Sequence, residues 1–510
     1  MKTLRKTKWV SVFCVAALAG SILAGCSGGS GESPSAQGSA TPDSSTPFEI
    51  SIGLAQVGDV PEKGNEVQQA IEKNTNTKLS IQWIPNAAYD EKVNLMIASG
   101  EMPQLLKVQY VPNTINAMQS GLFWEVGPYL KDYKNISAQN QQFFNNILVD
   151  GKLYGIPVFS DIARAGIVYR KDWLDNLGLK VPQTMEDWYN VIKAMTLNDP
   201  DNNGKKDTFG TLLFKRYNEG QASLTTRFAV AMGAPNKWGV NPDGSFTPEF
   251  ETKEYIDVLK LYKRLYDEKL LNQDFAAFDS TEADKLFDAG RVGIKIAVAG
   301  TAKSQQDRLS KIDPNAIVDV AQFNGPKGIR VAGQTGNSGI YVIPKSIVKT
   351  EAEVKRLLTF LDTLMEPDTA TLLTRGIENK HYVKTTDNQS EFKDFTLFQR
   401  EVKPYRDNLL QMDGYNNLPL KDVPIGIKGT QITRDNMNYS IPNPAQTLIS
   451  ATYSERGKEL EQQIWDAQTK FIMGKIDEAG YMAEIEKWKK AGGQQIMDEY
   501  KAAYAKQNKK

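Results

Sequence analysis

The stretch EISIGLA at residues 49–55 begins a pattern that decides the fold class. Its apolar residues alternate with polar or small ones, as in a strand with one buried face. Apolar residues at helical spacing follow at 67–71, and strand and helix patterns then repeat at 79–83, 93–97 and 105–110. This β-α-β-α-β order predicts a largely parallel sheet covered by helices, an architecture that binds ligands at the carboxyl ends of its strands.

The α/β pattern continues along most of the chain. Thr184 is followed by Asp187, and Thr350 by Glu353, and both pairs have the spacing of a helix-capping box. Residues 293–300 (GIKIAVAG) form the short apolar run of a buried strand. Beyond about residue 370 the apolar spacing becomes mainly helical. We therefore expect an α/β protein with a larger, mainly helical C-terminal part.

Length and composition exclude several classes of function. The chain has 510 residues, 61 basic and 61 acidic side chains, two Cys and one His. This length exceeds one hydrophobic core and indicates two or three subdomains. The balanced charge, without a basic stripe, argues against a nucleic-acid partner. So few Cys and His exclude a Cys-rich zinc module, and His381 is expected to be a satisfied loop histidine.

The N-terminus has the features of a lipoprotein signal peptide. Four cations precede an apolar run at residues 10–22 that is short for a bilayer span. The run ends in Leu23-Ala24-Gly25-Cys26, which resembles the bacterial lipobox, whose Cys receives a diacylglyceryl group. We predict a signal peptide at 1–25, a lipidated Cys26 and a flexible tether at 26–47. An ordinary signal peptide or a single membrane anchor is the alternative.

Several blocks resemble the extracellular solute-binding proteins of family 1, the sugar-capturing components of ABC importers, and especially their lipoprotein branch that includes alginate-oligosaccharide binders. Their shared order behind a lipobox and a tether carries the resemblance, which covers nearly all of the chain after the tether. The blocks are GNEVQQAI (64–71), YDEKVNLMIASG (89–100), DGKLYGIP (150–157), GIVYRKDWLDNLG (166–178), FDAGRVG (287–293) and the segment 471–500.

The resemblance implies a two-lobe periplasmic-binding-protein-like fold, in which hinge strands join two α/β lobes that close on a ligand. By analogy, the N-lobe comprises residues 48–160 and 337–400, and the C-lobe comprises residues 161–336 and 401–510. The implied crossings between the lobes lie at 155–163, at 331–341 and, for a third pass, at 399–405.

The resemblance also implies a function. The protein would be a monomeric, lipid-anchored receptor on the extracellular face of the cell membrane, and it would deliver an oligosaccharide to the permease of an ABC transporter without catalysis. Whether the sugar is a uronate, a pectin or xylan fragment or a neutral glycan stays open. A lipid-anchored hydrolase or lyase is the alternative, because a chain with 61 acidic residues does not exclude a catalytic carboxylate pair. A surface adhesin would show repeats, which are not seen.

Residues 198–210 (NDPDNNGKKDTFG) have the spacing of an EF-hand-like calcium loop. Alternate positions offer oxygen atoms, and Gly204 falls where such a loop turns sharply. Gly210 stands where a bidentate Glu is usual, so one charged ligand is missing, and a polar turn is the alternative interpretation. We expect a structural calcium ion whose ligands are Asp199, Asp201, Asn203, the carbonyl of Lys205, Asp207 and Thr208.

Sugar sites combine aromatic faces with hydrogen-bonding side chains. Position along the expected crossings selects the candidate ligand-binding residues, which are Phe159, Asp161, Arg164, Arg216, Tyr217, Trp238, Gln334, Asn337 and Tyr382. Arg164, Arg216 and Arg227 would suit a uronate carboxylate through bidentate pairing, and would equally suit internal salt bridges. For each candidate, a packing or surface role is the alternative.

Overall fold

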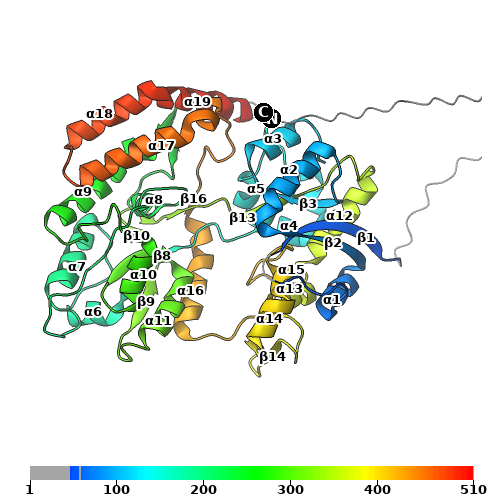
Figure 1. Ribbon diagram of the computed structural model, residues 1–510, viewed down its shortest axis with the longest axis horizontal. Coiled ribbons are helices and arrows are strands. Elements are labelled where there is room, and N and C mark those ends of the chain that lie inside the picture. Colours follow the sequence, from blue (N-terminus) through cyan, green and yellow to red (C-terminus); the bar gives the residue numbers. More distant parts are fainter. Residues whose placement is uncertain (1–45, 57–58, 509–510) are drawn as a thin grey trace, which may run out of the picture. The chain divides into compact units, whose positions relative to one another are not determined.

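The computed structural model describes residues 46–56 and 59–508 (Figure 1). The predicted signal peptide, Cys26 and nearly all of the predicted tether lie outside the described residues. Within the described ranges, no helix combines the length and the apolar character needed to cross a bilayer.

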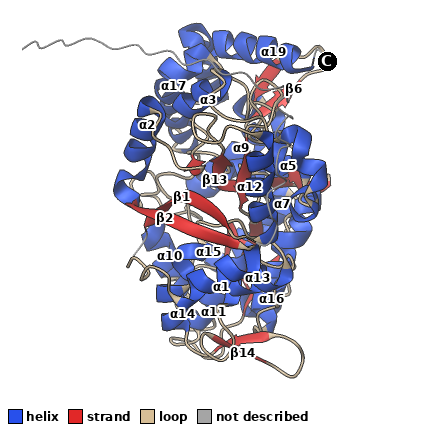
Figure 2. Cartoon of the chain, turned by 90° about the vertical axis from the view of Figure 1, so that its right-hand side faces the viewer, coloured by secondary structure: helices blue, strands red, loops and turns tan. Residues whose placement is uncertain are grey.

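The first lobe contains the parallel strands that the sequence predicts. β1 (Phe48–Gln56) pairs in parallel with β2 (Thr77–Pro85) along its whole length and with β3 (Leu105–Val108) on its other side (Figure 2). The connections are α1 (Glu66–Thr75) and α2 (Tyr89–Ser99). The alternating side chains of β1 explain this position, because its apolar residues are fully buried in the lobe's core.

Two further strands complete this sheet from distant parts of the chain. Within the described residues it has five strands in the order β2-β1-β3-β13-β4. β13 (Asn337–Val342) runs antiparallel to β3 and to β4 (Gly155–Phe159). The other helices of this lobe and its hairpin are α3 (Pro112–Gln119), α4 (Lys134–Ser137), α5 (Gln141–Asn145), α12 (Glu351–Thr363), α13 (Pro367–Arg375), β14 (Tyr382–Lys384), β15 (Ser390–Phe392), α14 (Phe395–Glu401) and α15 (Lys403–Arg406).

The second lobe has a different sheet. In its described part, β5 (Ala165–Arg170) is the centre of three antiparallel strands, between β8 (Ile294–Val298) and β9 (Val318–Ala321). The strand predicted at 293–300 is therefore confirmed as β8, but only its first residue, Ile294, is buried, and residues 295–298 are half-buried. The largely parallel sheet predicted from the pattern is found only in the first lobe, because apolar periodicity fixes which face of a strand is buried but not its direction.

Helices and short strand pairs form most of the second lobe. The helices are α6 (Lys171–Asn176), α7 (Met185–Leu197), α8 (Leu224–Ala231), α9 (Lys253–Asp267), α10 (Ser280–Asp288), α11 (Ala302–Leu309), α16 (Pro424–Asp435), α17 (Ala451–Ile472), α18 (Glu478–Trp488) and α19 (Gln494–Asn508). The strand pairs are β6 (Trp238–Val240) with β7 (Phe246–Pro248), β10 (Asn324–Gly325) with β11 (Gly328–Ile329), and β12 (Val331–Ala332) with β16 (Ser440–Ile441). Figure 1 shows the last three helices in orange to red, packed beside one another.

The chain changes lobes for the third time later than predicted. Phe398, Tyr405 and Leu410 are fully buried in the core of the first lobe, whereas Ile432 of α16 packs in the second. The crossing therefore lies in the segment between Leu410 and α16, not at 399–405, and the first lobe extends beyond the predicted boundary at 400. The apolar residues of α14 and α15 look the same in sequence whichever core receives them.

Candidate functional site

Two crossings run side by side between the lobes. β4 ends at Phe159 in the first sheet and β5 begins at Ala165 in the second, and β12 leads back into β13. The backbone N–H of Ser160 donates to the carbonyl of Gly336 at 3.0 Å, and that of Gln334 to the carbonyl of Ile162 at 3.0 Å. The second pass lies inside the implied range of 331–341, and the first pass, at 160–164, runs one residue beyond the implied range of 155–163.

The returning crossing is held in one conformation. The amide of Asn146 donates to the carbonyls of Gln334 and Thr335 at 3.1 and 3.0 Å. Gly336 has a φ of +75°, and a Cβ at this position would lie 2.5 Å from Cγ1 of Ile162, so no other residue fits. The side chain of Gln334 is consequently presented from a fixed backbone.

Only some of the hydrogen-bond donors of Arg164, on the first crossing, have a partner. One of its Nη atoms donates to Oε1 of Gln334 at 3.0 Å, whereas its buried Nε has no hydrogen-bond partner. Arg227 projects from the first turns of α8, and burial together with the charge of Arg164 lowers its pKa. The positive end of the α8 dipole also disfavours a cation there. Two like charges therefore lie close together without a carboxylate between them.

The third crossing brings further charges to the same place. Burial raises the pKa of Asp161, and the nearby charges of Arg164 and Arg434 oppose this shift, while Asp413 adds to it. Arg434, near the end of α16, packs on Gly414 so closely that a Cβ there would lie 2.1 Å from a guanidinium nitrogen.

We call Arg164, Arg227 and Arg434 the arginine cluster. Asp161 is the carboxylate within range of two of them, and Asp413 is already paired with Arg375 at 2.7 Å. None of the three guanidinium groups forms an ion pair with another residue of the described chain. Guanidinium groups bind carboxylates and phosphates through two parallel hydrogen bonds, so the cluster is suited to an anionic ligand.

The structure brings four of the predicted ligand-binding residues together. Asp161 and Arg164 lie on the first crossing, and Gln334 and Asn337 lie on the second. The amide of Asn337 is half-buried at the start of β13 and donates to the carbonyl of Thr335 at 3.3 Å.

The other predicted ligand-binding residues lie elsewhere. Phe159, 5% exposed, belongs to the first core and Tyr217, 1% exposed, to the second, because both apolar rings complete aromatic clusters there. Arg216 is 70% exposed and paired with a neighbouring carboxylate, and Tyr382 is buried in the β14 hairpin. Trp238 is half-buried and lines a cavity inside the second lobe. Position along the sequence could not distinguish residues at the crossings from residues in a core, on the surface or in a cavity wall.

Sequence reasoning missed part of the site. Arg434 and Asn146 carried no signal, because each approaches the crossings only through the fold. Arg227 could be selected for its charge alone, and its lack of a partner could not be read from the sequence.

The predicted calcium loop turns three carboxylates toward one another. Asp199 has a φ of +51° and accepts hydrogen bonds from the backbone of Asn203 and Gly204 at 3.1 and 2.9 Å. The amide nitrogen of Asn203 donates to Asp201 at 2.8 Å and to Asp207 at 3.3 Å. Burial and the charges of Asp199 and Asp207 raise the pKa of Asp201, whose Oδ1 is buried without a partner. This donor set suits a hard cation.

Two features separate the loop from a complete metal site. The hydroxyl of Thr208 donates to the carbonyl of Met195 at 2.8 Å, so this buried side chain faces α7 rather than the loop. Across the described residues, no group of three or more acidic, His or Cys side chains has the geometry of a metal centre. The amide nitrogen of Asn203 lies between two carboxylates, and a cation there would require this amide to turn its oxygen inward.

The sequence and the fold both match known proteins. Residues 58–367 match the family described as bacterial extracellular solute-binding protein. The chain is 38% identical to the polygalacturonan/rhamnogalacturonan-binding protein YtcQ of Bacillus subtilis, over 98% of this chain and 99% of that protein. It is 35% identical to the lipoprotein LipO of the same organism, over 99% of each. An extracellular solute-binding protein from Bifidobacterium longum subsp. infantis has a similar fold, with a TM-score of 0.68 over 91% of this chain and 99% of that chain at 16% identity.

Proposed function

This chain belongs to the bacterial extracellular solute-binding proteins, and from that premise we propose that it captures an acidic oligosaccharide of the pectin type and delivers it to the permease of an ABC transporter. The single observation that carries this proposal is the arginine cluster, whose three guanidinium groups form no ion pair within the described chain and have only Asp161 near two of them. Arg164 and Arg227 are half-buried, whereas Arg434 is exposed. Leaving the two half-buried cations unpaired is costly, and a bound uronate would supply the missing anion.

The site offers the complementary groups that a uronate needs. Arg164 and Arg227 face the same place and can hold a carboxylate by bidentate hydrogen bonds. Gln334 and Asp161 offer neutral and acceptor groups for sugar hydroxyls beside them. The relative YtcQ is named a polygalacturonan/rhamnogalacturonan-binding protein, which agrees with this class of ligand because galacturonan is a polymer of a uronic acid.

We also propose that the protein binds its ligand without turnover. Hydrolysis of a glycosidic bond generally needs two carboxyl groups on opposite sides of the bond. At the crossings Asp161 is accompanied by Asp413, which is held in an ion pair with Arg375. A receptor that closes on its ligand uses the hinge geometry of the crossings and needs no such pair.

The anchor and the calcium ion belong to the same proposal. The relative LipO is named a lipoprotein, which supports lipidation of Cys26 and an extracellular position at the cell membrane. The three inward carboxylates and the unpartnered Oδ1 of Asp201 support a structural calcium ion held by Asp199, Asp201, Asn203 and Asp207. Its position in a loop after α7 gives it no contact with the arginine cluster that the structure records.

Calorimetric titration of the purified protein with trigalacturonate tests the ligand class. Its neutral methyl ester is the matched control, because it keeps the ring and the linkage and loses only the negative charge. We expect the ester to bind about 10- to 100-fold more weakly, since a hydrogen bond to a charged group contributes about 1.5–3 kcal/mol. Equal affinities for both, or release of reducing ends during the titration, would reject the proposal.

A further inference from the structure

A cavity of about 390 Å³ lies inside the second lobe, and the arginine cluster does not line it. Residues of helices α17, α18 and α19, of β6 and of the segment 443–448 line it. This volume falls in the range of about 300–1,000 Å³ that is usual for small-ligand pockets. Trp238, selected from the sequence as a ligand contact, lies in its wall.

Aromatic rings line the cavity. Trp238 and Trp465 are half-buried and Trp488 is buried, and all three line the cavity. Edge contacts with Tyr500, at 5.1 Å between ring centres, hold the indole of Trp238 in place. Flat, fixed rings of this kind pack against the weakly apolar C–H face of a pyranose ring.

The polar part of the lining consists of amide groups. Gln221 and Gln446 are hydrogen-bonded to each other across the opening, and the amide of the buried Asn218 donates to Oε1 of Gln468 at 2.6 Å. An amide both donates and accepts, as a sugar hydroxyl does, so the two can exchange hydrogen bonds without a charge. Rings and amides together favour a polyhydroxylated ligand.

The lining carries one cation, and it is paired. Lys237 lies 3.1 Å from Glu249, which also accepts from the hydroxyl of Thr226 at 2.8 Å. Glu461 accepts from the neutral hydroxyl of Tyr453 at 2.9 Å. In contrast to the arginine cluster, this cavity has no unpaired cation among the residues described, so its lining favours an uncharged ligand over an anionic one.

The cavity and the arginine cluster are neighbours along the hinge. The amide of Asn236 donates to the carbonyls of Gly333 and Ile441, at 2.8 Å each. Gly333 precedes Gln334, the partner of Arg164, while Trp238 follows Asn236 by two residues, a distance of at most about 7 Å along the chain. A short, hydrogen-bonded segment of chain therefore connects the wall of the cavity to the crossing that carries Gln334.

We infer that this cavity binds a neutral sugar unit of the same oligosaccharide whose acidic unit binds the arginine cluster. The inference rests on the proposed function, because it takes the ligand to be an acidic oligosaccharide. It adds that the protein selects mixed chains, in which neutral and uronic units are joined, over purely acidic chains.

The test compares two ligands in calorimetric titrations of the full-length protein: trigalacturonate, and a tetramer in which galacturonate alternates with rhamnose. Trp465→Ala is expected to weaken binding of the mixed tetramer about tenfold and to change binding of trigalacturonate less than twofold. Phe395→Ala, which removes an exposed ring on α14, is the matched control and should change neither. Because Trp465 is half-buried, Gln446→Ala provides a second variant that removes only a rim amide, with a smaller effect in the same direction.

The outcomes distinguish failure of the neutral-sugar subsite from failure of the proposed function. Equal weakening of both ligands by Trp465→Ala, or no weakening of either, would overturn the cavity as a neutral-sugar subsite. Failure of the wild-type protein to bind either ligand would instead reject the proposed function.

Discussion

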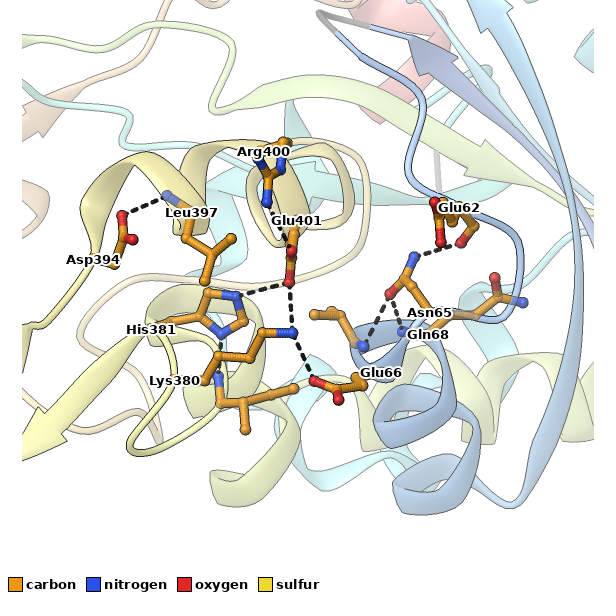
Figure 3. A network of polar contacts seen from close by, with 12 residues as sticks. Glu62, Asn65, Glu66, Gln68, Lys380, His381, Asp394, Leu397, Arg400 and Glu401 are labelled. Carbon is orange, nitrogen blue, oxygen red and sulfur yellow. Dashed lines mark hydrogen bonds and ion pairs between the residues drawn. The ribbon is translucent and has the colours of Figure 1, made fainter.

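Two groups of charged side chains in this protein differ in whether their charges have partners of opposite sign. In the first lobe, Lys380 lies 2.6 Å from Glu66 and 2.8 Å from Glu401, and Nε2 of His381 lies 3.4 Å from Glu401 (Figure 3). We call these four residues the Lys–His network. Each cation there faces a carboxylate, whereas the arginine cluster at the crossings has more cations than carboxylates.

This difference distinguishes charged residues that stabilise the fold from charged residues that are available to bind a ligand. Paired charges satisfy one another and need nothing from outside the molecule. The expectation that His381 is a satisfied loop residue holds only for Nδ1, which accepts from the backbone N–H of Ile377 at 2.9 Å, because its buried Nε2 has no hydrogen-bond partner. Cations that the fold leaves unpaired mark the place where a ligand supplies the anion.

The largest expected effect comes from removing the unpaired charge. Replacing Arg164 and Arg227 together by Met should weaken binding of trigalacturonate at least about 100-fold, since two charged hydrogen-bond partners contribute about 3–6 kcal/mol in total. The melting temperature should stay the same or rise, because the repulsion between the two cations disappears. Isothermal titration and thermal unfolding measure the two effects, with the exposed Arg216→Met as control. A marked loss of stability without loss of binding would show that Arg164 and Arg227 stabilise the fold and do not bind the ligand.

The calcium loop extends the comparison to unpaired negative charge. In the Asp199→Ala/Asp207→Ala variant, calcium should no longer raise the melting temperature. In the wild type, the ion at 100 times its dissociation constant should add about 2.7 kcal/mol to the free energy of unfolding. Asp175→Ala, which removes an exposed carboxylate from α6, should leave the calcium response intact. A wild-type protein that melts at the same temperature with calcium and with chelator has no such site.

The Lys–His network predicts a pH effect on stability. Burial lowers the pKa of His381 below its ordinary value of 6.5, with Glu401 opposing the shift. The unfolded chain therefore binds more protons between the two values, so this stabilisation is complete above about pH 6.5 and is lost as the pH falls through the folded-state pKa. The slope is at most about 1.4 kcal/mol per pH unit for one group.

The His381→Asn variant tests this effect, because the Asn oxygen can still accept from Ile377. Denaturant unfolding between pH 5 and 7.5 should show a flatter profile for the variant than for the wild type. Parallel profiles would show that His381 does not titrate on unfolding in this range.

The smallest effect is expected at the exposed edge of the same network. Glu66 is 67% exposed and its partner Lys380 is 33% exposed, so Glu66→Ala should reduce the free energy of unfolding by no more than about 1 kcal/mol. Its effect should shrink further in high salt, because water and ions screen the pair. A loss much above this value in denaturant unfolding would show that even the exposed part of the network is needed for the fold.

Much of the local structure followed from the sequence. The capping boxes of Thr184 with Asp187 and of Thr350 with Glu353 are both formed, because each depends on atoms only three residues apart. The parallel strands β1, β2 and β3 follow their predicted pattern for a similar reason, since neighbouring segments of alternating and helical periodicity have few ways to pack. The third crossing was misplaced because α14 and α15 carry apolar faces that fit either core.

By itself, the sequence determined the elements, the α/β class of the first lobe and the family to which the chain belongs. Only the tertiary structure decided which charged residues are left unpaired. Arg164, Arg227 and Arg434 come from a crossing and from two helices far apart in the chain, and nothing in their neighbours indicates that they meet. Whether a buried charge has a partner depends on distances of a few ångströms between remote segments, and the packing of the two lobes sets these distances.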